Sequence, residues 1–186
     1  MKENIKTEIA SSIRVKEMIA DTQIANIEAA AKAIIASLKR GGKVLVFGNG
    51  GSAADSQHFV AELVGRFKKE REAFGAIALS VNTSTLTAIA NDYGYEATFA
   101  RQVEALGKIG DIAFGISTSG NSRNVIVAIK KARELGLITI GLLGCNGGNI
   151  KKECDISIIA ESNDTPHVQE SHIMIIHIIC GLIDEI

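Results

Sequence analysis

Apolar positions near the start of the chain recur with the period of a helix. Isoleucines stand at Ile5, Ile9 and Ile13, and a second stretch over 24–38 is rich in alanine, isoleucine and leucine. Apolar residues three or four positions apart form one face of a helix. The pattern predicts an N-terminal arm of two amphipathic helices over residues 1–40, which we expect to serve in oligomerisation.

After a Gly-Gly pair, short apolar runs rich in β-branched residues alternate with helical patterns. Such runs are typical of strands buried in a parallel sheet. The predicted strands are 43–47, 76–81, 112–116, 139–143 and a weaker fifth at 156–159. The predicted helices are 53–66, 84–90, 121–135 and a last long helix from about 165 to the C terminus. This succession indicates an α/β fold, a five-stranded parallel sheet with helices on both faces, in a single domain over 1–186.

Charge and cysteine content narrow the classes of function. The chain has 20 Lys and Arg against 21 Asp and Glu, without a long block of either sign, so neither nucleic acid nor an anionic membrane surface is a predicted partner. The longest apolar stretch is short and interrupted, and the start lacks a secretory pattern, so we predict no membrane span and a cytoplasmic location. Three scattered cysteines predict reduced, mostly buried thiols rather than a disulfide framework or a zinc ribbon.

A glycine-rich turn follows the first predicted strand of the sheet and opens a helix. It reads GNGGSAAD over 48–55, and the amides and dipole at a helix N-terminus favour an anion. The turn matches only the alanine variant of the dinucleotide fingerprint, lacks the acidic residue expected about 20 residues later, and has no Walker lysine. The alternative is a tight strand-to-helix turn with Ser52 as its N-cap.

A second turn of this kind follows the third predicted strand and is rich in hydroxyl groups. They belong to Ser117, Thr118, Ser119 and Ser122, and at a helix start they offer a phosphate neutral donors without Lys or Arg. Alone, the segment is equally well explained as a polar loop with a capping serine. Ligands of parallel α/β sheets bind beyond the carboxyl ends of the strands, so the two turns together predict an anion site.

Histidines on two predicted helices are candidate metal ligands. His58 and Glu62 are four residues apart and share a helix face, although a plain surface pair has the same spacing. His172 and His177 are five residues apart, roughly 140° around the axis, and cannot bind one ion together. His177 lies in an apolar stretch and is either a core histidine or a ligand. This last helix is apolar on nearly every side, which predicts burial between subunits.

Taken together, these motifs resemble the phosphoheptose isomerases, the sedoheptulose 7-phosphate isomerase branch of the sugar isomerase (SIS) domain family. The resemblance covers essentially the whole chain. It is carried by the glycine turn, His58, Glu62, Asn91, Asp92, the serine-rich turn, Gln169, Glu170, His172 and His177. It implies conversion of sedoheptulose 7-phosphate to D-glycero-D-manno-heptose 7-phosphate, toward activated heptose for bacterial surface glycans such as lipopolysaccharide, by a cytoplasmic homotetramer.

The resemblance also implies the residues of the site. The zinc ligands would be His58, Glu62, Gln169 and His177. The substrate contacts would be Asn49, Gly50, Gly51, Ser52, Glu62, Asn91, Asp92, Ser117, Thr118, Ser119, Ser122 and Gln169. His167 stands where relatives often carry arginine, which leaves its role open.

Moving a carbonyl between adjacent carbons requires one base and one acid. The base takes a proton from C1, and the acid returns a proton at C2 through an enediol. Glu62 is the predicted base and His177 the predicted acid, while zinc would polarise the carbonyl. A zinc-bound carboxylate is a weaker base, so we expect Glu62 to alternate between ligand and base.

Helix geometry adds a prediction about the subunits. Gln169 and His177 are separated by about 12 Å along the last helix and roughly 80° around it. One ion about 2 Å from both would strain a continuous helix, which predicts a site shared between chains.

Two other functions are compatible with the fold. A non-enzymatic SIS protein that binds a replication initiator is disfavoured because all four implied ligands are present. A sugar-phosphate-sensing regulator is disfavoured because the chain has no helix-turn-helix segment or basic recognition helix.

Overall fold

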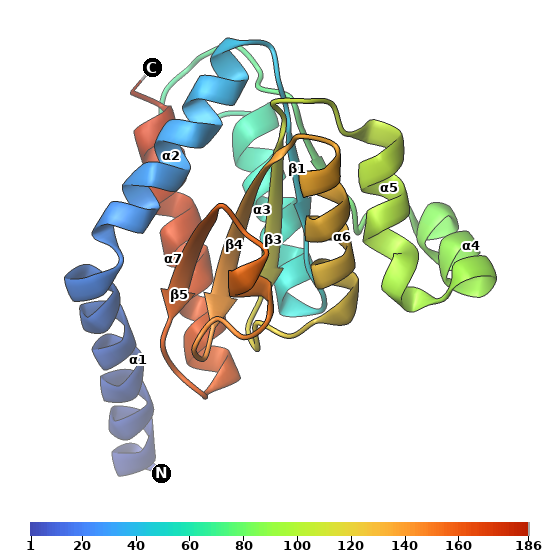
Figure 1. Cartoon of the computed structure of the whole chain (residues 1–186). Helices are drawn as coiled ribbons and strands as arrows, with labels where there is room; N and C mark the ends of the chain where they lie inside the picture. The colour runs from blue at the N-terminus through green and yellow to red at the C-terminus, as the bar shows by residue number, and fades with distance from the viewer. Residues whose placement is uncertain (186) are drawn as a thin grey trace.

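The computed structural model of the chain describes residues 1–185 and contains one five-stranded parallel sheet (Figure 1). The strand order is β2-β1-β3-β4-β5. The strands are β1 (Val44–Phe47), β2 (Ala76–Ala78), β3 (Ile112–Ser117), β4 (Ile138–Gly144) and β5 (Ile156–Ala160). All five predicted strands are therefore present, although β2 is shorter than its apolar run and the weakly predicted β5 is fully formed.

Seven α-helices and two short 3₁₀ turns complete the described structure. They are α1 (Lys2–Thr22), α2 (Ile24–Lys39), α3 (Gly51–Val64), α4 (Thr83–Tyr93), η1 (Tyr95–Ala97), α5 (Thr98–Leu106), α6 (Arg123–Glu134), η2 (Ile150–Lys152) and α7 (Thr165–Ile183). The sequence pattern did not predict α5, whose nine residues follow a glycine and a 3₁₀ turn. The last helix ends at Ile183 rather than at the C terminus, and residue 186 lies outside the described residues.

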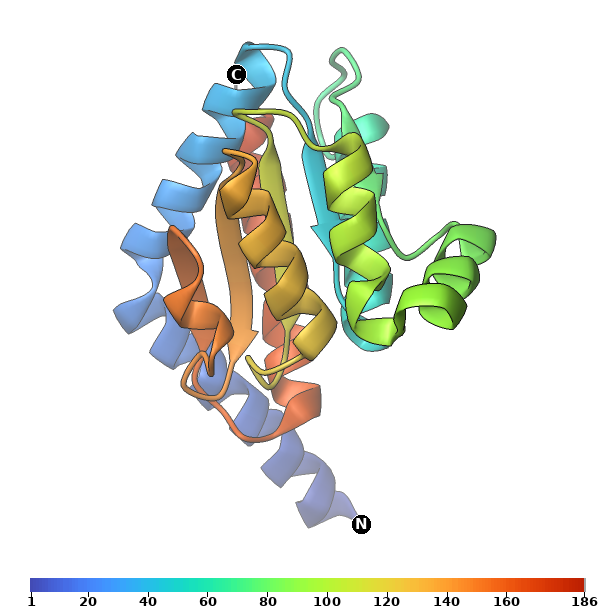
Figure 2. The same ribbon diagram turned by 45° about the vertical axis from the view of Figure 1, so that its right-hand side comes forward.

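Helices cover both faces of the sheet, as predicted (Figures 1 and 2). Alternate residues of a strand point to opposite faces, so Val44 and Val46 of β1 join the core under α1, α2, α3 and α7. Leu45 and Phe47 join the core under α5 and α6. Helix α4 lies outside α5 and has no buried residue. The sheet is therefore buried between two helical layers.

Helix α1 extends away from the rest of the molecule (Figures 1 and 2). Val15 and Ile19 near its C-terminal end are buried against the core. The predicted apolar face over Ile5, Ile9 and Ile13 remains at least half exposed. The arm thus consists of a packed part and a projecting part with an uncovered apolar stripe.

The burial of α7 comes largely from the chain itself. The helix contacts α1, α2 and α3 on its sides and the strands β4 and β5 beneath it. Ile173, Met174 and Ile178 remain partly or largely exposed. Burial between subunits stays a prediction for this remaining strip. No helix in the described part of the chain combines the length and apolar character that crossing a bilayer requires.

A buried ion pair ties the segment after α3 to the end of α7. Asp184 accepts hydrogen bonds from the main-chain N–H groups of Lys68 (2.7 Å) and Lys69 (3.0 Å) and from Arg71 Nε (3.0 Å). Arg71 also donates to the Glu62 carbonyl oxygen at 2.8 Å. Burial raises the pKa of Asp184, but the two amides and the guanidinium outweigh that effect and hold the pKa below its ordinary value. This clamp fixes the ends of α3 and α7 relative to each other.

We expect Asp184→Ala to lower the free energy of unfolding at pH 7 by roughly 2–4 kcal/mol, because Arg71 and two amides lose their acceptor. Urea denaturation measures the loss. The pKa of Asp184 is lower in the folded state than in the unfolded state. Its contribution to the free energy of unfolding is therefore fully present at pH values above the ordinary pKa of 3.8, and it declines as the pH falls below that value. Glu185→Ala, at the exposed neighbour, is the control. Equal stability of the two variants at pH 7 would contradict the clamp.

Candidate active site

The glycine turn after β1 approaches the neighbouring strand closely. A side chain at Gly48 would place its Cβ 2.7 Å from the Cβ of Ser52 and 2.9 Å from the carbonyl oxygen of Ile116, so only glycine fits. Gly50 is the N-cap of α3 and has a φ of 56°, a conformation that glycine tolerates. The alternative with Ser52 as the N-cap is wrong, because this conformation starts the helix at Gly51 and places Ser52 inside it, buried.

The serine-rich turn after β3 lies beside the glycine turn, because β1 and β3 are adjacent parallel strands. The hydroxyl oxygens of Ser117 and Ser122 lie 2.9 Å apart, and Ser122 is the N-cap of α6. The Ser119 hydroxyl accepts a hydrogen bond from the Asn121 N–H at 3.2 Å and is exposed. The structure thus brings the hydroxyl cluster and the glycine turn to one edge of the sheet, as predicted.

A pair of amides joins the two turns. Asn49 Nδ2 donates to Asn124 Oδ1 at 2.9 Å, and Asn124 Nδ2 donates back to Asn49 Oδ1 at 2.9 Å. The Tyr95 hydroxyl also donates to Asn49 Oδ1, at 3.0 Å. Asn124 and Tyr95 were missed by sequence reasoning, since nothing in their local sequence marks them. They hold the predicted substrate contact Asn49 in place.

Asn91 and Asp92 stand apart from this network. They lie near the exposed end of α4, where Asn91 Nδ2 donates to Asp92 Oδ1 at 2.8 Å. Among the described residues, no hydrogen bond joins this pair to either turn. Their contact with substrate stays a prediction.

The predicted base and acid meet at one histidine. His58 and Glu62 lie on α3, and His58 Nε2 is 3.2 Å from Glu62 Oε1. Across the gap to α7, His58 Nε2 is 2.9 Å from His177 Nε2. The ring of Phe67 stacks on His177 with centroids 5.6 Å apart. His177 is partly exposed and contacts polar groups, so it is not a core histidine.

The donor atoms of this cluster fit a zinc ion in kind and nearly in spacing. Two imidazole nitrogens and a carboxylate oxygen are typical zinc donors, and atoms bound tetrahedrally at about 2.0–2.1 Å from zinc lie about 3.3 Å from one another. The two separations measured from His58 Nε2, 2.9 and 3.2 Å, are close to this value. Glu62 and His177 each contact His58, and a closer approach between them is needed before one ion can reach all three.

Gln169 lies near the N-terminal end of α7, beside the first turns of α3. Its Nε2 donates to Asp55 Oδ1 at 2.7 Å. Asp55, on α3, is only 3% exposed, and its Oδ2 is buried without a hydrogen-bond partner. Burial raises the pKa of Asp55 to about 6, against the lowering effects of Gln169 and of His58. Sequence reasoning missed Asp55, which looked like an ordinary residue of the glycine motif.

The structure therefore does not bring Gln169 into hydrogen-bond contact with His58, Glu62 or His177. It lies beside Asp55, one helical turn before His58. Within one chain, α3 and α7 run in the same direction, and the contacts of Asp55 and His58, three residues apart on α3, reach Gln169 and His177, eight residues apart on α7. Glu62 and His177 of one chain both contact His58, while the shared site predicted from the position of Gln169 stays a prediction.

His172 is a core residue and, as predicted from its spacing, does not join His177 in one cluster among the described residues. It is fully buried. Burial lowers the pKa of His172 to about 4, against a weaker opposing contact with the main chain of Leu143. The imidazole is therefore neutral at physiological pH. The thiols are all free, but only Cys180 is buried, and Cys145 and Cys154 are partly exposed, contrary to the prediction of mostly buried thiols.

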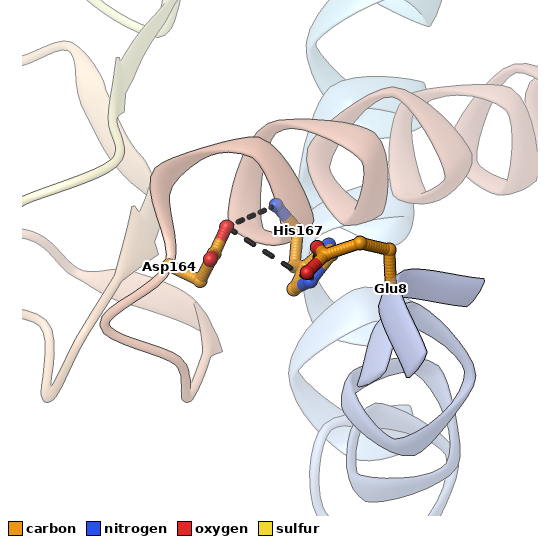
Figure 3. Close-up of side chains that lie close together, drawn as sticks. All are labelled: Glu8, Asp164 and His167. Carbon is orange, nitrogen blue, oxygen red and sulfur yellow. Dashed lines mark hydrogen bonds and ion pairs between the residues drawn. The ribbon is translucent and has the colours of Figure 1, made fainter. Parts of the chain in front are cut away.

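A second cluster lies where α1 crosses the start of α7 (Figure 3). His167 Nε2 is 3.3 Å from Glu8 Oε2 and 4.0 Å from Asp164 Oδ1. In the described residues, these are the only three His, Cys, Asp or Glu side chains whose ligand atoms all lie within 4.8 Å of one another. The group could hold a metal ion, although Glu8 and Asp164 are exposed and Asp164 also caps α7. Sequence reasoning did not connect these residues, which are distant in the chain.

Comparisons with known proteins place the chain in a family. The SIS domain model matches residues 9–144. The phosphoheptose isomerase of Clostridium acetobutylicum is 54% identical over 100% of this chain and 95% of its own length. The structure of a phosphoheptose isomerase from Neisseria gonorrhoeae has a TM-score of 0.94 and 42% identity, covering 100% of this chain and 99% of that one.

A more distantly related structure shares the fold of this chain at low sequence identity. The sugar isomerase domain of an RpiR transcription factor from Sphaerobacter thermophilus has a TM-score of 0.63 and 21% identity, covering 95% of this chain and 87% of that one. This likeness concerns the fold only. The two phosphoheptose isomerases above are 54% and 42% identical to this chain over almost their full length. The chain therefore belongs to the SIS domain family and, within it, to the phosphoheptose isomerases, a family of sugar-phosphate isomerases.

Proposed function

We propose that the chain converts sedoheptulose 7-phosphate to D-glycero-D-manno-heptose 7-phosphate, in the supply of activated heptose for bacterial surface glycans. The observation that carries this proposal is the contact of His58 with both Glu62 and His177 on the helix that begins at the glycine turn. An isomerase of a phosphorylated sugar needs a base, an acid and an anion site close to one another.

The phosphate group binds to the serine-rich turn, through Ser117, Thr118, Ser119 and Ser122. Neutral hydroxyl donors at the start of α6 suit a phosphate that is bound and released in each turnover. The sugar chain lies over the adjacent glycine turn, in contact with Asn49, Gly50, Gly51 and Ser52. Asn91, Asp92, Glu62 and Gln169 complete the contacts with the substrate.

Proton transfer is divided between the two helices. Glu62 on α3 removes the proton from C1, and His177 on α7 returns a proton at C2. Phe67, stacked on the His177 ring, limits the rotation of that imidazole and shields one of its faces from water. The oxygen of Glu62 that does not contact His58 is free to reach the substrate carbon.

A zinc ion is held by His58, Glu62, Gln169 and His177. The mixed nitrogen and oxygen donors, and the two separations at His58 Nε2, support His58, Glu62 and His177, whereas Gln169 is included because the resemblance implies it. When bound, zinc polarises the substrate carbonyl as a Lewis acid. Because a zinc-bound carboxylate is a weaker base, Glu62 would serve either as a ligand or as the base at any one moment.

The active protein is a cytoplasmic homotetramer in which a second copy completes the site. An open hollow of about 420 Å³ borders His177, and its apolar lining includes Phe67, Ile173, Met174 and Ile178. The exposed stripe of α1 is a second apolar surface that a copy of this chain can cover. Both surfaces support assembly through the arm of residues 1–40 and through α7.

We expect Glu62→Gln and His177→Gln each to lower turnover by about 10²-fold or more while the oligomer stays intact, because each removes one proton-transfer group. Aldose formation from sedoheptulose 7-phosphate with added zinc measures turnover, and native mass measures assembly. Glu70→Gln, at an exposed carboxylate on the following segment, is the control. Wild-type turnover in either folded variant refutes the assignment, and no aldose from the unaltered protein refutes the function.

Ser119→Ala is expected to weaken the binding of the phosphorylated sugar by roughly 1–3 kcal/mol, because a phosphate oxygen loses its donor. Isothermal calorimetry at fixed salt measures the affinity. The control is Ser11→Ala, a partly exposed serine on α1 whose hydroxyl accepts from Arg14. Equal affinity in both variants removes Ser119 from the phosphate site.

The two histidine clusters make opposite predictions for zinc. We expect His58→Ala to lose bound zinc and His167→Ala to retain it, because His58 is the centre of the proposed ligand set. Elemental analysis after dialysis against a weak chelator gives the metal content per chain. The reverse result, loss in His167→Ala alone, would move the ion to the cluster of Glu8, Asp164 and His167.

A further inference from the structure

The environment of Asp55 is unusual for a structural carboxylate. Its side chain is buried between α3 and α7, yet only Oδ1 has a hydrogen-bond partner, the Gln169 amide at 2.7 Å. Burying a carboxylate without satisfying both oxygens costs free energy. An apolar residue would fill the space between the helices without that cost. The carboxylate therefore needs an explanation beyond packing.

The chemistry of the pair supplies one. A carboxylate accepts hydrogen bonds and donates none, whereas the end of a glutamine has a donating NH₂ group and an accepting oxygen. Asp55 therefore binds the NH₂ group of Gln169 and turns the amide oxygen away from itself. A neutral amide at position 55 would not impose this direction, because it could bind either end of Gln169.

We propose that Asp55 is a positioning residue, which fixes the Gln169 side chain so that its oxygen, rather than its NH₂ group, faces the metal. The inference rests on the proposed function, in which Gln169 is a zinc ligand. Oxygen is a donor atom for zinc, and a protonated amide nitrogen is not. The position of Asp55 fits this role, since it lies one turn before His58 on the same helix.

Exchanging the acid and the amide between positions 55 and 169 tests whether the orientation of the side chain at 169 matters, and not only its contact with position 55. Asp55→Asn keeps the size of the side chain but lets Gln169 turn, and we expect zinc affinity to fall by about 10- to 100-fold, as for other groups that orient metal ligands. The double variant Asp55→Asn with Gln169→Glu restores a fixed direction, because the new asparagine amide then donates to the new glutamate carboxylate, whose second oxygen is free for zinc. We expect it to recover most of the lost affinity.

Zinc affinity is measured on the metal-free protein by competition with a chromophoric chelator. Thermal unfolding of each variant shows whether the fold is kept, and Asp155→Asn, a carboxylate bonded to Thr139 away from the site, is the matched control. Wild-type affinity in folded Asp55→Asn overturns the proposal. So does a double variant that is folded but binds zinc no better than Asp55→Asn alone.

A second measurement needs no metal. In the wild-type protein, the side-chain NH₂ group of Gln169 should show slowed hydrogen exchange by nuclear magnetic resonance, and Asp55→Asn should lose that protection. Unprotected Gln169 in the wild type overturns the orientation. A wild-type protein whose zinc does not depend on His58 overturns the proposed ligand set instead, while the exchange of Gln169 still decides whether Asp55 orients it.

Discussion

The parallel packing of α3 along α7 is the constraint on which the rest of the site depends. Phe59 and Leu63 of α3 share one hydrophobic core with Ile175 and Ile176 of α7. Apolar packing of this kind holds two helices together but tolerates a shift between them more readily than directed hydrogen bonds do. A slide of one turn would displace every contact by about 5.4 Å.

Polar contacts at three levels fix the register of this helix pair. Asp55 bonds to Gln169 at one end, His58 meets His177 in the middle, and Asp184 binds the segment that follows α3 at the other end. A single slide breaks all three, so the contacts reinforce one another. The clamp at Asp184 is distant from the substrate edge, yet it preserves the geometry there because a helix transmits a displacement along its length. Stability and the proposed chemistry thus depend on the same interface.

The sequence predicted the parts of this structure that have a local periodicity. The apolar runs marked all five strands, and the two turns could be placed at one edge because parallel strands end there. The same reasoning failed for the start of α3, since Ser52 is a good capping residue but Gly50 takes the capping position. It also failed for α5, whose nine residues follow a glycine and a 3₁₀ turn.

Contacts between distant residues could not be predicted in this way. Asp55 and Gln169 are 114 positions apart, and Asn49 and Asn124 are 75 apart. Each member of these pairs is a common polar residue with no distinctive neighbours in sequence. Only the packing of the helices and turns reveals that a glutamine bonds to an aspartate, or that two asparagines bond to each other. The pairing of His58 with Glu62 could be predicted from the sequence because both residues lie on one helix, four positions apart.

The two histidine clusters illustrate why proximity alone does not identify a metal site. Glu8, Asp164 and His167 have the tighter grouping, but two of the three are exposed carboxylates, and an oxygen-rich, solvated set suits a hard ion such as Mg²⁺ or Ca²⁺ better than zinc. Their contacts are also explained without a metal, since Glu8 pairs with the imidazole and Asp164 caps α7. The cluster at His58 is looser, but it offers two imidazoles with nitrogens aimed at each other, and a neutral pair can place only one proton between them. That proton makes the contact an ordinary hydrogen bond, and the same two nitrogens could both serve as ligands if a cation replaced the proton. The chemistry of the donors is therefore the reason why the proposed zinc site is centred on His58, which lies on the helix that begins at the glycine turn.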